Sequence, residues 1–132
     1  MSLKVTNIND LRKIAEGEVV ELPGFSGAPF VARLKQASLV KLVSSGRIPN
    51  KLLGIATALF NSDTDKLNKE LEKKEGIQGL HEIMSAMAEA CLVEPTMKDI
   101  EDAGLELRDI QLSAIFNYSQ RGVEGLETFR SR

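Results

Sequence analysis

The sequence is poor in the side chains that enzymes most often use for chemistry. Its 132 residues include one cysteine, Cys91, one histidine, His81, one tyrosine and no tryptophan. A single cysteine excludes an intramolecular disulfide, a CxxC redox pair and a zinc site built from several cysteines. Motifs of the HExxH and DxDxDG types are also missing. We therefore expect no catalytic residue, no metal site and no cofactor.

An excess of one charge and a long apolar run are missing as well. The 17 Lys and Arg residues against 19 Asp and Glu give a net charge of -2, which disfavours nucleic-acid binding. The apolar-rich stretch at 52–60 is much too short to span a bilayer. The N-terminus lacks the apolar segment of a signal peptide. We therefore expect a cytoplasmic protein without nucleic-acid or membrane partners.

The remaining composition is that of an ordinary globular protein. Hydrophobic residues make up 42% and charged residues 27%, and the length suits a single domain spanning 1–132. We predict a mainly α fold, namely a small helical domain with a short N-terminal β-hairpin packed on the helices. A mixed segment, 1–36, contains the hairpin, and 37–132 form the helical body.

The mixed segment begins with helical spacing and continues with strand signals. Apolar residues recur at helical intervals in 8–15, where Asn7 or Asn9 can serve as the N-cap. Short strands are expected at 18–22 and 29–34, joined by Gly- and Pro-rich turn signals. Because an isolated hairpin is marginally stable in water, it should pack on the following helices.

The body shows a succession of helical patterns separated by Gly and Pro. Ser38 is placed to cap the first of these helices, and Gly46 to end it. Charged residues dominate 64–75, which indicates a solvated helix or connector, with a recognition surface as the alternative. Helices are expected at 38–45, 49–60, 77–92, 97–103, 108–121 and 123–129.

Several single residues allow both a structural and a functional interpretation. His81 is expected on a helix surface, with metal binding as the alternative. Cys91 shares a helical face with Met84 and Met87, which favours packing in the core. The two methionines also suit an adaptable binding groove. The glycine-rich segment 22–29 is interpreted as a turn, because it lacks the residues of a phosphate-binding loop.

A protein-binding surface is expected at two places. Arg47 lies at a corner between two helices, where it either serves the connection or contacts a partner. Apolar side chains near the end of the chain either complete the core or form an exposed docking patch. The candidate partner-binding residues are Arg47, Phe116, Tyr118, Val123, Leu126 and Phe129.

Several segments, in the same order along most of the chain, are similar to those of a known protein family. The segments 30–39, 45–53, 58–60, 91–95, 105–112 and 118–130 carry this similarity. With these segments the sequence resembles tail assembly chaperones of long-tailed phages and prophages of Gram-positive bacteria. The resemblance implies a non-catalytic protein of the bacterial host cytoplasm that binds the tape measure protein and the tail tube protein. A structural tail or head–tail joining protein is the alternative, and the sequence leaves self-association open.

Overall fold

The structure is a computed structural model that describes residues 3–121, and within that range it is mainly helical. The helices are α1 (Ile8–Glu16), α2 (Leu39–Ser44), the 3₁₀ helix η1 (Asn50–Leu52), α3 (Leu53–Phe60), α4 (Thr64–Leu71), α5 (Gly76–Cys91), α6 (Met97–Asp102) and α7 (Asp109–Arg121). The strands are β1 (Glu18–Phe25), β2 (Ala28–Leu34) and β3 (Leu92–Glu94), in an antiparallel sheet of order β1-β2-β3. The predicted class, mainly α with some β structure, is confirmed. The helix predicted at 123–129 lies outside the described residues.

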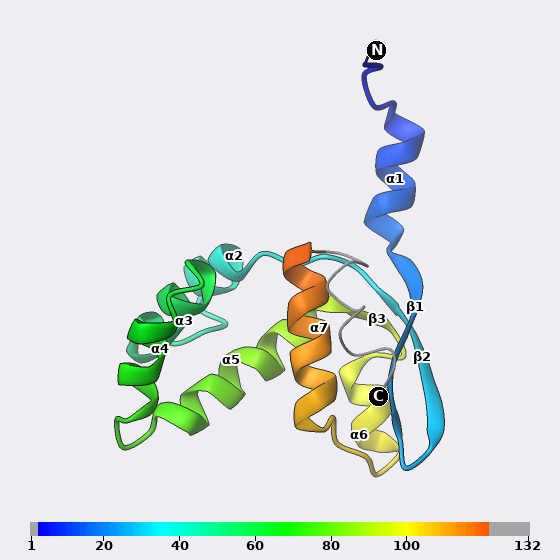
Figure 1. Ribbon diagram of the computed structural model, residues 1–132. Coiled ribbons are helices and arrows are strands. Elements are labelled where there is room, and N and C mark those ends of the chain that lie inside the picture. The colour runs from blue at the N-terminus through cyan, green and yellow to red at the C-terminus, as the bar shows by residue number, and fades with distance from the viewer. Residues whose placement is uncertain (1–2, 122–132) are drawn as a thin grey trace.

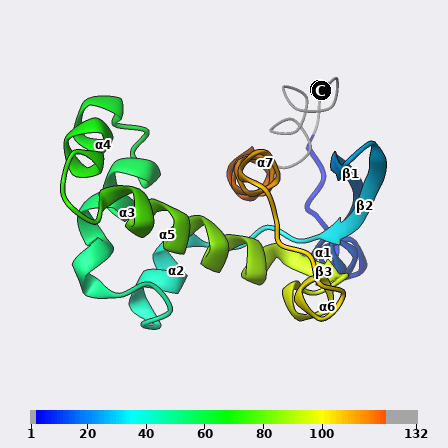
Figure 2. The ribbon, with the colours of Figure 1, turned by 90° about the horizontal axis from the view of Figure 1, so that it is seen from below.

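Helix α5 is the axis of the molecule (Figures 1 and 2). Helices α2, α3 and α4 gather around its N-terminal half, and the sheet and α6 lie at its C-terminal end. Helix α7 packs beside α5 and also contacts β1. Helix α1 projects away from this body (Figure 1). Helix α5 therefore contacts both groups of elements, the helices α2, α3 and α4 at one end and β3 at the other.

The first two strands pair directly across a tight turn. Phe25 pairs with Ala28, so the loop consists of Ser26 and Gly27, which both have positive φ, at 47° and 89°. Two consecutive residues with positive φ are typical of a hairpin turn whose twist matches that of the strands. The strands therefore extend further toward the turn than the predicted ranges 18–22 and 29–34.

The third strand was not predicted from the sequence. Strand β3 follows α5 without a loop, and its Leu92 pairs with Leu34 of β2. The prediction placed Leu92 at the end of the preceding helix. A strand of three residues is too short to show a period of two, and it exists because a distant strand pairs with it.

The core lies where α5, α7 and the sheet meet. Ile83, Met87 and Cys91 of α5 are fully buried, together with Leu34 of β2 and Ile115 of α7. Their spacing on α5 is the helical period that the sequence showed. The expectation that Met87 and Cys91 belong to the core is confirmed.

A buried polar side chain joins α7 to the hairpin. Gln111 is fully buried, and its Nε2 donates to the carbonyl oxygen of Pro23 at 2.9 Å. Its Oε1 accepts from the backbone N–H of Arg108 at 2.7 Å. Both ends of the amide are therefore satisfied, which a buried polar group needs in order not to cost stability.

Two helices begin at side-chain caps that the sequence indicated. Asn7 caps α1 by accepting from the N–H of Asp10 at 2.8 Å, and Ser38 caps α2 in the same way.

Helix α4 has no buried residue, so the charge-rich segment is a solvated helix, as expected. No helix in the described range, 3–121, has the length and apolarity required to traverse a membrane.

Candidate functional site

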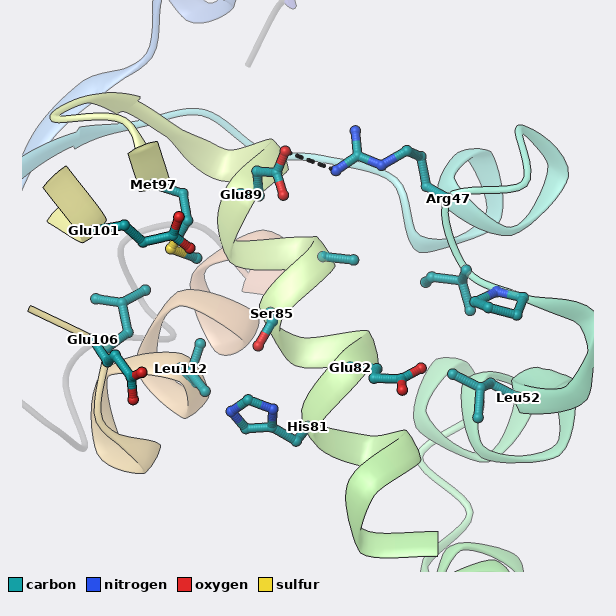
Figure 3. Close-up of a pocket in the computed structure, with 14 residues that line it drawn as sticks. Arg47, Leu52, His81, Glu82, Ser85, Glu89, Met97, Glu101, Glu106 and Leu112 are labelled. Atoms are coloured by element: carbon teal, nitrogen blue, oxygen red, sulfur yellow. Dashed lines mark ion pairs between the residues drawn. The ribbon is translucent and has the colours of Figure 1, made fainter. Parts of the chain in front are cut away.

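A concave surface of about 650 Å³ runs along α5 (Figure 3). It is an open groove rather than an enclosed pocket. One wall comes from the connection between α2 and η1, and the other comes from α6, α7 and the segment that joins them. We call this surface the α5 groove. Its lining residues are Arg47, Ile48, Pro49, Leu52, His81, Glu82, Ser85, Ala86, Glu89, Met97, Glu101, Glu106, Leu107 and Leu112.

The base of the groove is the side of α5 that faces away from the core. Glu82, Ser85, Ala86 and Glu89 follow one another at intervals of three, one and three residues, which puts them on one helical face. The opposite face, which contains Ile83, is buried in the core. Small side chains therefore lie at the middle of the base, between two glutamates.

The walls supply the apolar contacts of the groove. Ile48 and Leu52 form one wall and are buried to more than nine-tenths of their surface. Met97, Leu107 and Leu112 form the other wall (Met97 and Leu112 are labelled in Figure 3). Because these five side chains also pack against the core, the apolar walls are fixed in place by the fold.

Carboxylates surround this apolar lining. Four glutamates, Glu82, Glu89, Glu101 and Glu106, line the groove, whereas Arg47 is the one Lys or Arg among the described lining residues. Arg47 Nη2 lies 3.0 Å from Glu89 Oε1, and the side chains are 48% and 56% exposed. That ion pair neutralises one carboxylate, so the groove carries a net negative charge.

Two properties of the described side chains bear on metal binding and on the reactivity of the thiol. No group of three or more His, Cys, Asp or Glu side chains in residues 3–121 is arranged to hold a metal ion. Burial raises the pKa of the Cys91 thiol to about 11, so it stays protonated at neutral pH and is a poor nucleophile. His81 is exposed at the groove, in agreement with the surface position expected for it.

The candidate partner-binding residues are dispersed in the structure. Arg47 lies on the rim of the α5 groove. Phe116 is partly buried and packs against the core. The prediction that Tyr118 contacts a partner is wrong, because its side chain is 2% exposed and cannot offer its ring to a partner. Three of the candidates lie outside the described residues: Val123, Leu126 and Phe129.

The surroundings of Tyr118 explain its burial. Its hydroxyl donates to Glu18 Oε1 at 2.7 Å and lies 3.3 Å from the carbonyl oxygen of Leu34. Burial, followed by the contact with the Glu18 carboxylate, raises the pKa of this phenol. Tyr118 therefore joins α7 to β1 and β2. Its periodic position on α7 could not reveal this partner, which lies 100 residues away in sequence.

The acidic rim of the groove was not predicted from the sequence. One signal was available on α5, where two glutamates seven residues apart flank Ser85 and Ala86. The contributions of Glu101 and Glu106 had no such signal, because the fold brings α6 and the segment after it beside α5.

Two further apolar surfaces are exposed. Helix α1 has no buried residue, and its Ile8, Leu11 and Ile14 are 60%, 49% and 65% exposed. A shallow trench of about 220 Å³ between α2 and α3 includes Val40 and Phe60, which are more than half exposed. The described residues that line the trench include no charged residue, whereas α1 carries charged side chains of both signs beside its apolar residues.

Comparisons with known proteins assign no relative. No protein-family model, no curated protein and no solved structure matches the chain.

Proposed function

We propose that this protein is a phage tail assembly chaperone that binds the tape measure protein and tail tube subunits in the bacterial host cytoplasm, without catalysis. The observation that carries the proposal is the α5 groove, whose fixed apolar walls suit one face of a helix. The sequence resemblance described above supplies the phage context.

Helix binding in a groove fits the demands of such a role. A long helical protein that is synthesised before its tube forms would expose apolar stripes, which promote aggregation. A groove that covers one stripe at a time gives modest affinity per contact, and several copies along one chain would add up. Modest affinity also permits release when tube subunits replace the chaperone.

The hairpin has a supporting part in this proposal. Leu112 of α7 lines the groove, and its neighbour Gln111 donates a hydrogen bond to the carbonyl oxygen of Pro23 in β1 of the hairpin. We propose that the hairpin, by packing on the helices, holds α7 and hence one wall of the groove in position.

Coexpression tests the function directly. The chain is produced with a candidate tape measure protein from the same genome and, separately, with the candidate tail tube protein. We expect more soluble tape measure protein and a complex that survives affinity purification and gel filtration. Equal insolubility with and without this chain, together with the absence of a complex, would contradict the proposal.

Purified particles distinguish a chaperone from a structural tail or head–tail joining protein. A chaperone should be depleted from mature virions, whereas a structural component should be present in fixed stoichiometry. Quantitative mass spectrometry of purified particles makes the measurement. Abundant peptides from this chain would replace the chaperone proposal by the structural alternative.

A further inference from the structure

The chemistry of the α5 groove specifies the segment that occupies it. We infer that the groove binds an amphipathic helix whose apolar stripe is flanked by lysine or arginine side chains. The inference rests on the proposed function and narrows the partner to a basic helical segment, such as one within the tape measure protein.

Charge complementarity favours a basic occupant. Glu101 and Glu106 are exposed on one wall, and Glu82 lies at the base. Among the described lining residues Arg47 is the single Lys or Arg, and it is already paired with Glu89. A helix with acidic flanks would be repelled here, whereas Lys or Arg side chains would find carboxylates on both sides of the stripe.

The shape of the groove base favours a helix seated along α5. Ser85 and Ala86 are small and partly buried, so a partner backbone can approach α5 closely at its middle. Glu82 lies one turn before this point and Glu89 one turn after it. An apolar stripe seated over Ser85 and Ala86 therefore has the carboxylate of Glu82 near one end and the Arg47–Glu89 ion pair near the other.

A second copy of this chain is the principal competing occupant. Helix α1 exposes an apolar face and carries Arg12 and Lys13, so it shares some of the required chemistry. It also carries Asp10 and Glu16, which the groove would repel. The balance of charge favours a foreign basic helix over α1.

Synthetic peptides of defined charge test the inference directly. One probe is a helical peptide of about 18 residues, long enough to fold on binding, with a leucine stripe flanked by lysines. The other probe carries glutamates in place of the lysines. We expect the lysine peptide to bind at least about tenfold more tightly by calorimetry, with affinity falling as salt increases. Equal affinity for the two peptides would overturn the inference.

Charge reversal then locates the site. The variant Glu82→Lys/Glu101→Lys/Glu106→Lys should weaken binding of the lysine peptide about tenfold to a hundredfold. The matched control, Glu16→Lys/Glu21→Lys/Glu72→Lys, makes the same change in net charge at exposed positions away from the groove. Similar losses in both variants would show nonspecific attraction and would contradict the assignment.

A steric variant gives an independent readout. Ser85→Arg fills the base of the groove, should abolish peptide binding and should leave cooperative unfolding in urea intact. If Ser85→Arg misfolds, the charge-reversal variant still decides the question. Sedimentation of the unmodified chain tests the second copy, because self-association that Ser85→Arg and deletion of residues 1–16 both abolish would identify α1 as the occupant and overturn the inference.

The same variants separate this inference from the proposed function. If the tape measure protein forms a complex that charge reversal leaves unchanged, the function stands and the groove assignment fails. If the lysine peptide binds in the groove but no complex with a tail protein forms, the groove assignment stands and the phage function fails.

Discussion

Helices α1 and α5 share one sequence pattern but differ in the structure. Both have apolar residues at helical spacing, and both were predicted from that spacing. Helix α5 buries Ile83, Met87 and Cys91 completely, whereas α1 buries nothing. Periodicity therefore establishes that an apolar face exists, and the tertiary structure decides whether anything covers it.

The largest expected effect contrasts one isoleucine on each helix. Ile83→Ala should lower the free energy of unfolding by about 2–5 kcal/mol, because it opens a cavity in the packed core. Ile14→Ala should change it by less than about 0.5 kcal/mol, since Ile14 is 65% exposed. Urea denaturation measures both. A loss at Ile14 that grows with protein concentration would show that another copy covers α1.

Alkaline pH should lower the free energy of unfolding, because the buried thiol of Cys91 on α5 loses its proton. The pKa of Cys91 is raised from 9.0 to about 11 by burial, so the folded state holds the thiol proton more tightly than the unfolded chain does. The contribution of the Cys91 thiol to the free energy of unfolding is fully present below pH 9 and is lost as the pH rises toward 11. The loss should reach about 2 kcal/mol near pH 10.5.

Cys91→Ala provides the control for this pH dependence. Its stability in urea should fall less steeply between pH 8.5 and 10.5 than that of the unmodified chain, whatever its stability at neutral pH. Identical slopes would show that Cys91 is not the titrating group. Tyr118, whose pKa is also raised, should add a loss in the same direction at higher pH.

Gly79 tests how closely α5 packs against its neighbours. A Cβ atom there would lie 2.7 Å from Leu52 Cδ2 and 2.9 Å from Ile55 Cδ1, both in buried side chains. Replacement of glycine by alanine normally stabilises a helix interior by about 1 kcal/mol. Overpacking should reverse the sign, so Gly79→Ala should cost a net of about 1 kcal/mol in thermal or urea unfolding. Stabilisation by Gly79→Ala, with little change in the exposed control Gln78→Ala, would contradict this close packing.

The smallest effect on global stability is expected at the cap of α1. Asn7→Ala removes the side-chain acceptor for the Asp10 N–H and should weaken α1 locally by about 1 kcal/mol. Amide exchange in residues 8–16 should accelerate while global unfolding stays unchanged. Thr96→Ala is the matched control, because its capping box begins α6, which buries Ile100, and its loss should appear in global unfolding.

The predictable parts of the fold were those encoded by local signals. Ser38 was predicted correctly as a cap, and the structure selects Asn7 from the two predicted alternatives, Asn7 and Asn9. Such caps are predictable because a capping side chain acts within three residues. Strand β3 and the burial of Tyr118 escaped prediction because each depends on a partner elsewhere in the chain. The groove was predicted only in part, since Arg47 was singled out as a partner contact but the glutamates around it were not predicted to form an acidic rim.

The sequence alone determined most of the described helices, the cap at Ser38, the hairpin and the small number of cysteine and histidine residues, because spacing and residue type set these properties locally. The tertiary structure decided which apolar faces are covered and which carboxylates converge. Helix α5 lies between two groups of elements that both pack against it, and α1 is separated from them by its projection from the body. The acidic rim exists because α6 and the segment after it form one wall of the groove whose base is α5. No local pattern could specify that juxtaposition, which depends on the burial of the whole core.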